Sequence, residues 1–156
     1  MRKLNIAHPT FDYEKGDPAG FRSGMVRLGP LLDAEITGVS VYELPPGEAL
    51  CPYHYEYGEE EWLIVLEGHP SVRHPEGSER LDPWDVVCFP RGPKGAHRVS
   101  NETEEPVRVL MFSNVLLPTA TVYPDSDKIG VWTGNREDDL LVRRSSRVDY
   151  FDGEAG

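Results

Sequence analysis

Residues 54–68 read His-Tyr-Glu-Tyr-Gly-Glu-Glu-Glu-Trp-Leu-Ile-Val-Leu-Glu-Gly, and in them metal-capable side chains lead directly into a short apolar run. A continuous apolar run that ends at a turn glycine is typical of a strand covered on both faces. Since side chains alternate along a strand, we expect Glu61 on the same face as Leu63 and Val65, with Trp62 on the opposite face. The stretch predicts a buried strand that begins with an inward carboxylate.

The rest of the chain has the pattern of turn residues that is typical of an all-β protein. Its 15 glycines and 14 prolines are scattered over 156 residues and separate many short β-rich segments. Regularly spaced turns between such segments are typical of a β-sandwich or barrel. The length is that of one domain with a sizeable core.

Charge and composition exclude several classes of function. Lys and Arg total 16 against 27 Asp and Glu, a formal net charge of −11, and such a surface repels a nucleic-acid backbone or an anionic membrane. No stretch approaches the roughly 18 apolar residues of a membrane span. The N-terminus lacks the apolar segment of a secretory signal, and with two cysteines we expect no disulfide framework and a cytoplasmic location.

A second stretch, Pro-Arg-Gly-Pro-Lys-Gly-Ala-His-Arg-Val-Ser-Asn at residues 90–101, delivers another histidine after a rigid turn. His54 and Glu56 are two residues apart on an extended segment and therefore project from one face. Glu61 could come alongside them, and His97 could close the site from a neighbouring strand. Imidazole nitrogen and carboxylate oxygen are ligands of divalent first-row metals.

The sequence therefore predicts one divalent metal ion held by His54, Glu56, Glu61 and His97. Two carboxylates favour Mn²⁺ or Fe²⁺, with Zn²⁺ and Ni²⁺ also compatible. The alternative is that the acidic run at residues 56–61 forms a solvated loop and the histidines are incidental.

Together the two stretches resemble the paired motifs of the cupin superfamily. The matching residues are Gly47, His54, Glu61 and Gly68 in the first motif, and Pro90, Gly92, His97 and Asn101 in the second. Glu56 stands where the first motif has its second histidine, and two extra residues separate Gly92 from His97. The spacing to Gly68 favours Glu61 over Glu60 as the ligand. The resemblance covers residues 35–115 and implies a small double-stranded β-helix, or jelly-roll barrel.

We expect three parts in the chain. Residues 1–20 form an N-terminal arm, residues 21–117 the cupin β-barrel, and residues 118–156 a C-terminal hairpin with a tail that packs on the barrel. The arm, the hairpin and the outward Trp62 offer surface that a twofold partner could bury, so a homodimer is expected.

The resemblance extends to one-domain bacterial cupins of the sugar-phosphate-isomerase type, which also carry a Tyr-Pro-Asp-Ser-x-Lys turn like residues 123–128. It implies isomerase-type chemistry on a small polar molecule, sugar-like or anionic, with the metal as Lewis acid. Glu56 or Glu61 would move the proton. The cations expected to bind an anionic substrate are Arg91, Lys94 and Lys128, the alternative for each being ordinary surface charge.

Two other functions fit the same residues. Two histidines and a carboxylate with open positions are the pattern of Fe²⁺-dependent oxygenases, which predicts a dioxygenase. A metal with a fully closed ligand shell would instead favour a non-catalytic module that binds or senses a small molecule.

Overall fold

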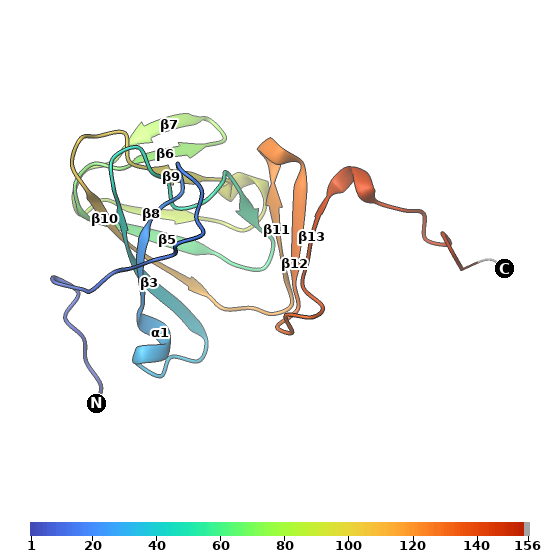
Figure 1. Cartoon of the computed structure of the whole chain (residues 1–156), viewed down its shortest axis with the longest axis horizontal. Coiled ribbons are helices and arrows are strands. Elements are labelled where there is room, and N and C mark those ends of the chain that lie inside the picture. Colours follow the sequence, from blue (N-terminus) through green and yellow to red (C-terminus); the bar gives the residue numbers. More distant parts are fainter. Residues whose placement is uncertain (155–156) are drawn as a thin grey trace.

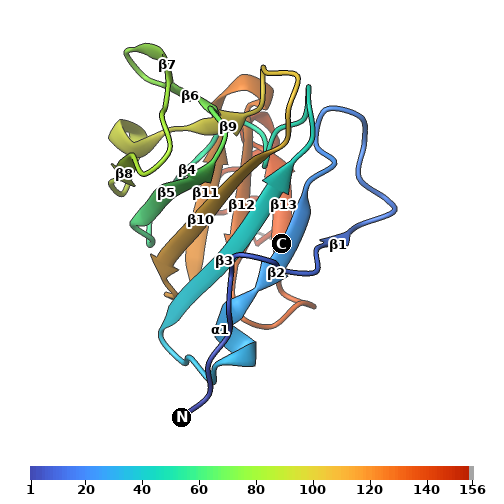
Figure 2. The same ribbon diagram turned by 90° about the vertical axis from the view of Figure 1, so that its left-hand side faces the viewer.

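The computed structural model describes residues 1–154 and is almost entirely β (Figures 1 and 2). Its only α-helix is the single turn α1 (Leu28–Leu31) among these residues. Every strand pairing is antiparallel. The all-β fold class and the barrel predicted from the sequence are confirmed.

One six-stranded sheet forms a wall of the barrel, in the order β1-β2-β3-β10-β5-β8. Its long central strand β10 pairs with both β3 and β5, which bury its two edges. The strands are β1 (Asp12–Tyr13), β2 (Gly24–Arg27), β3 (Thr37–Leu44), β10 (Val107–Asn114), β5 (Glu61–Glu67) and β8 (Val86–Phe89).

Two smaller sheets complete the molecule. The order β7-β6-β9 joins β7 (Gly77–Arg80), β6 (Ser71–His74) and β9 (Arg98–Ser100). The order β13-β12-β11-β4 joins β13 (Leu140–Arg143), β12 (Lys128–Trp132), β11 (Thr119–Tyr123) and β4 (Tyr55–Glu56). Of three short 3-10 helices, η1 (Pro93–Gly95) lies between β8 and β9, η2 (Pro124–Ser126) lies between β11 and β12, and η3 (Arg144–Ser146) follows β13. Figure 1 shows the β7-β6-β9 sheet above the long strands and β11–β13 at the side of the barrel.

The core lies between the sheets and follows the predicted alternation. On β5, Leu63 and Val65 are fully buried on the inward face that begins with Glu61. Full burial of one such side chain stabilises the fold by about 1.5–3 kcal/mol. Trp62 lies on the other face and stacks on Phe112 of the neighbouring β10, with ring centroids 5.9 Å apart. A neighbour in the same sheet thus covers the outward tryptophan.

The C-terminal segment is more than an appended hairpin. The predicted hairpin is present as β12 and β13, and β11, a strand that was not predicted, pairs with β12 on one side and with β4 on the other. Through β4 this sheet reaches the segment that carries His54. The tail beyond η3 extends away from the barrel (Figure 1), and Tyr150 and Phe151 are 87% and 68% exposed and contact each other.

No helix within residues 1–154 is both long enough and apolar enough to cross a membrane.

Candidate metal centre

Three of the four predicted ligands meet inside the barrel. The potential ligand atoms of His54, Glu61 and His97 all lie within 4.8 Å of one another. Glu61 Oε2 is 3.6 Å from Nε2 of each histidine. The backbones of the two histidines are joined by a β-bridge with N–H to carbonyl distances of 3.1 and 2.8 Å. This isolated bridge, just before β4 and β9, therefore fixes how far apart the two imidazoles stand.

The hydrogen bonds of the histidines prepare them for a metal. Nδ1 of His54 is 3.0 Å from the carbonyl oxygen of Pro52, and Nδ1 of His97 is 2.9 Å from that of Gly95. Because a carbonyl oxygen only accepts, each Nδ1 carries a proton, and each Nε2 points toward Glu61, where it can offer a lone pair once it is deprotonated. A backbone carbonyl that orients a ligating histidine in this way is a common feature of protein metal sites.

The spacing also fits a metal ion. Ligands at about 2.1 Å in a tetrahedron stand roughly 3.4 Å apart, close to the 3.6 Å separations seen here. The donors are two neutral-type nitrogens and one carboxylate oxygen, a set suited to first-row divalent ions. The residues present therefore fit the metal that the sequence predicted.

Burial and neighbouring charges shift the pKa values of the three groups in different directions. Burial lowers the pKa of His97 to about 4, with the positive charge of His54 acting in the same direction. Burial also lowers the pKa of His54, but Cys51 and Glu61 outweigh it and raise this pKa. Burial raises the pKa of Glu61, and the two histidines bring it below its usual value. His97 is thus neutral near pH 7, whereas a metal ion has to displace the proton on His54.

Glu56 lies beside this group but is held by other residues. Its Oε1 is 4.0 Å from His54 Nε2. The hydroxyl of Thr121, directly opposite on β11, is 2.7 Å from both carboxylate oxygens. Burial raises the pKa of Glu56, and the Thr121 bond and the charge of His54 oppose that rise. Glu56 is therefore a buried carboxylate with its own hydrogen-bond donor.

Trp132 completes this arrangement from β12. Its indole Nε1 donates to the Thr121 hydroxyl oxygen at 2.7 Å. Since the indole only donates, the single hydroxyl proton of Thr121 is directed to Glu56. Gly130 stands opposite Thr121, and a Cβ there would lie 2.7 Å from the indole ring, so a glycine is what lets the ring lie across the strand.

The acidic run is not a solvated loop as a whole. Glu60 is exposed and accepts a bond from Trp62 Nε1 at 3.2 Å on the outer face, so Glu61 is the one that lies with the histidines. Glu59 is partly buried, and burial together with Glu56 and Glu61 raises its pKa to about 7.

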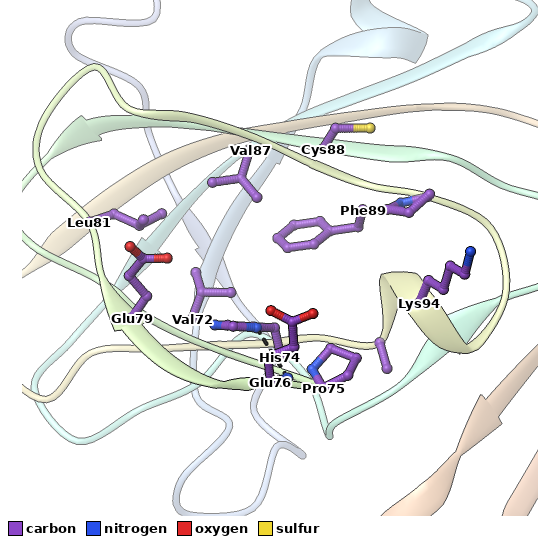
Figure 3. Close-up of a pocket in the computed structure, with 12 residues that line it drawn as sticks. Val72, His74, Pro75, Glu76, Glu79, Leu81, Val87, Cys88, Phe89 and Lys94 are labelled. Carbon is purple, nitrogen blue, oxygen red and sulfur yellow. Dashed lines mark hydrogen bonds between the residues drawn. The ribbon is translucent and has the colours of Figure 1, made fainter.

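The predicted substrate-binding cations lie in three different places. Arg91 is exposed in the loop before η1. Lys94 lines a cavity of about 590 Å³ between β6–β7 and β8, and its ammonium points away from it (Figure 3). The ring of Phe89 separates this cavity from the metal group, because it stacks on His97 with centroids 3.7 Å apart.

Lys128 has the closest link to the candidate site among these cations. Its Nζ is 5.2 Å from the centroid of the Tyr123 ring, and that ring stacks against His54 at 6.0 Å. Sequence reasoning found this lysine but missed Thr121 and Trp132. The segment Thr-Ala-Thr-Val-Tyr at residues 119–123 has only the signal of an ordinary strand, and nothing in it points to a carboxylate 65 positions earlier.

Comparison with known proteins agrees with this geometry. Residues 40–113 match the family model described as the cupin domain. A structure from Acidithiobacillus ferrooxidans, designated a candidate sugar phosphate isomerase, is 22% identical, with 92% of this chain and 91% of that chain covered and a TM-score of 0.81. A sugar phosphate isomerase of the cupin superfamily from Silicibacter pomeroyi is 21% identical over 97% and 98% of the two chains, with a TM-score of 0.80.

A third similar structure is the polyketide cyclase RemF from Streptomyces resistomycificus, 21% identical over 73% of this chain and 79% of that one, with a TM-score of 0.59. No curated protein matches the chain. Fold and site together define a small antiparallel β-barrel with two histidines and a carboxylate grouped inside. The chain contains a cupin domain, as its two motifs predicted.

Proposed function

We propose that this protein is a metal-dependent enzyme that carries out isomerase-type chemistry on a small polar molecule, sugar-like or anionic. One observation carries the proposal: a buried metal-binding group, His54, Glu61 and His97, stands next to a separately held carboxylate, Glu56. The names of two similar structures, both sugar phosphate isomerases, support the choice of reaction class.

His54, Glu61 and His97 would hold the metal ion, and Mn²⁺, Fe²⁺, Zn²⁺ and Ni²⁺ all suit these donors. Such an ion acts as a Lewis acid, drawing electron density from adjacent oxygens of a bound substrate. With three protein ligands, such a site would have room for those oxygens, unlike a structural site with four protein ligands. The sequence predicted Glu56 both as a fourth ligand and as a group that moves the proton, and we propose the second role for it.

Glu56 has the properties of a general base. It accepts a hydrogen bond from Thr121, and its nearest cation, His54 Nε2, is 4.0 Å away, so its carboxylate oxygens still have lone pairs that can take a proton. Isomerisation at a carbon next to a carbonyl requires a proton to leave one carbon and return to its neighbour. A single carboxylate can take and return that proton without net change.

A homodimer remains our proposal for the assembly. Its support is the apolar surface that the single chain leaves uncovered, above all in the C-terminal tail at Val148, Tyr150 and Phe151. A cytoplasmic location is proposed with it on the grounds of composition alone.

The test is elemental analysis of untagged protein purified without added metal, compared with the variants His97→Ala and His74→Ala. His74 lies on the outer hairpin and serves as the matched control. We expect a near-stoichiometric transition metal in the wild type and in His74→Ala, and its loss in His97→Ala. Wild-type protein without metal, and without uptake on incubation with Mn²⁺, Fe²⁺, Zn²⁺ or Ni²⁺, would contradict the proposal.

A second candidate is an Fe²⁺-dependent dioxygenase, favoured by the two-histidine, one-carboxylate composition of the group. Oxygen consumption by the iron-loaded protein in the presence of candidate substrates would support it. Isomerisation with equal rates under nitrogen and air would exclude it.

A further inference from the structure

A second cavity, of about 250 Å³, lies apart from the metal group and brings positive charge together. Its wall comes from the N-terminal segment, the stretch before His54, β9 and the turn around η2. None of His54, Glu61 and His97 lines it. The lining residues are Phe21, Pro52, Tyr53, Arg98, Asp125, Ser126 and Lys128.

Arg98 is the residue that most needs a partner here. It follows His97 in the sequence, and alternation on β9 turns it to the opposite face. Its Nε is buried and has no hydrogen-bond acceptor, and the guanidinium forms no ion pair within residues 1–154. A buried donor of a charged group without an acceptor is costly, so a small turn of this side chain toward an anion in the cavity would be favourable.

The other charges leave the cavity positive. Asp125 lies in the wall, but both of its carboxylate oxygens accept from the guanidinium of Arg73. Lys128 has no ion-pair partner among the described residues. The cavity wall therefore holds two cations without a partner and one carboxylate that Arg73 already neutralises, in a chain whose formal net charge is −11.

Two aromatic rings support these cations. The Arg73 guanidinium lies 3.9 Å from the centroid of the Tyr53 ring, and that of Arg98 lies 5.6 Å from the centroid of the Phe21 ring. A guanidinium on an aromatic face is positioned without using its N–H donors; those of Arg98 stay available for an anion, whereas those of Arg73 already bind Asp125.

We propose that this cavity binds a phosphate-sized oxyanion, either free phosphate or the phosphoryl group of a small molecule, between Arg98 and Lys128. The arginine fork suits a bidentate contact with two phosphate oxygens, and the lysine supplies a point charge. The Ser126 side chain lies in the same wall. A volume of about 250 Å³ holds a phosphate group with a few further atoms. The inference does not depend on the metal site.

The experiment is an NMR titration of the full-length ¹⁵N-labelled protein with inorganic phosphate, with glycerol 3-phosphate and with glycerol. We expect both phosphate compounds to shift the Arg98 Nε–H signal and the backbone amides of Ser126 and Lys128, while glycerol shifts none of them. Tighter binding of glycerol 3-phosphate would identify a phosphorylated small molecule as the ligand, and equal affinities would identify free phosphate. Repeating the titration with His97→Ala separates this cavity from phosphate bound at a metal, and the same shifts are expected there.

The variants test the charges one by one. Arg98→Met and Lys128→Met keep the apolar stems, and each is expected to weaken phosphate binding roughly tenfold, as for loss of one charge-assisted hydrogen bond. Arg80→Met, on the exposed strand β7, is the matched control and should leave affinity unchanged. Asp125→Asn should tighten binding, because it removes the only carboxylate and frees Arg73, whereas simple damage to the cavity would weaken it. Absence of shifts at about 10 mM phosphate, or affinity unchanged in both Met variants, would overturn the proposal.

Discussion

The barrel interior has an apolar half and a polar half, and strand β5 runs through both. Its inward positions are Glu61, Leu63 and Val65, so the same face passes from a candidate metal ligand to fully buried core within three alternate residues. In the apolar half, contacts are non-directional and depend on volume. In the polar half, the histidines and Glu56 each have a specific partner, and function depends on angles as well as distances.

The two halves therefore tolerate different amino-acid substitutions. A core position accepts another apolar side chain of similar volume at small cost. A buried polar network that loses one member leaves its neighbour unsatisfied, so even an isosteric change has consequences. Stability and metal binding should therefore respond to separate sets of substitutions.

The largest expected effect is on the metal. Glu61→Gln removes the only carboxylate of the three-residue group, and we expect its metal affinity to fall by more than roughly 100-fold, beyond the usual effect of second-layer residues. Competition titration with a chromophoric chelator measures it. Glu60→Gln, one residue away on the outer face, is the control and should retain wild-type affinity. A reversed result would make Glu60 the ligand.

The second-largest effect is expected in the apolar half, on the free energy of unfolding. Leu63→Ala should lower the free energy of unfolding by about 2–5 kcal/mol, because it leaves a cavity in the core, while metal stoichiometry stays unchanged. Urea denaturation followed by circular dichroism checks the first part, and elemental analysis the second. Leu63→Met keeps most of the volume and should cost less than about 1.5 kcal/mol. Loss of metal in Leu63→Ala would show that the halves are not separable.

A smaller effect is expected at Thr121. Thr121→Val keeps the shape but removes the proton that holds Glu56, which is then free to approach the metal as an additional oxygen ligand. We expect metal affinity to rise roughly tenfold, the size typical of second-layer changes but opposite in sign to the usual loss. Thr121→Ser retains the hydroxyl and should resemble the wild type. Weaker binding in Thr121→Val would mean that Thr121 supports the site instead of holding Glu56 away.

The smallest effect lies outside both halves. Tyr13 on β1 donates to Glu43 at 2.7 Å, and burial followed by Glu43 raises its pKa to about 12. The folded state therefore holds this proton more tightly than the unfolded state, so its contribution is complete below about pH 10 and is lost as pH rises toward 12. Unfolding midpoints measured from pH 9 to 12 should fall less steeply in Tyr13→Phe. Identical slopes would show that the bond contributes nothing in solution.

Much of the apolar half, and the grouping of His54, Glu61 and His97, could be predicted from the sequence. The alternation from Glu61 to Val65 is a local signal, and the residue types at His54 and His97 have few other uses at that spacing. The partners of Glu56 could not be predicted, because strand pairing between Thr121 and Glu56 joins distant segments and threonine is an ordinary strand residue. Arg98 was missed for a related reason: only the fold shows which charged side chains lack a counter-ion.

The pairing of β4 with β11 also sets an order for assembly. A chain leaving the ribosome exposes His54, Glu61 and His97 well before residues 119–132, which orient Glu56. Synthesis runs at about 5–20 residues per second, so the three candidate ligands leave the ribosome seconds before the residues that orient Glu56, the proposed proton carrier. On this order, a nascent chain contains all three candidate ligands before it contains the residues that would orient the proposed proton carrier.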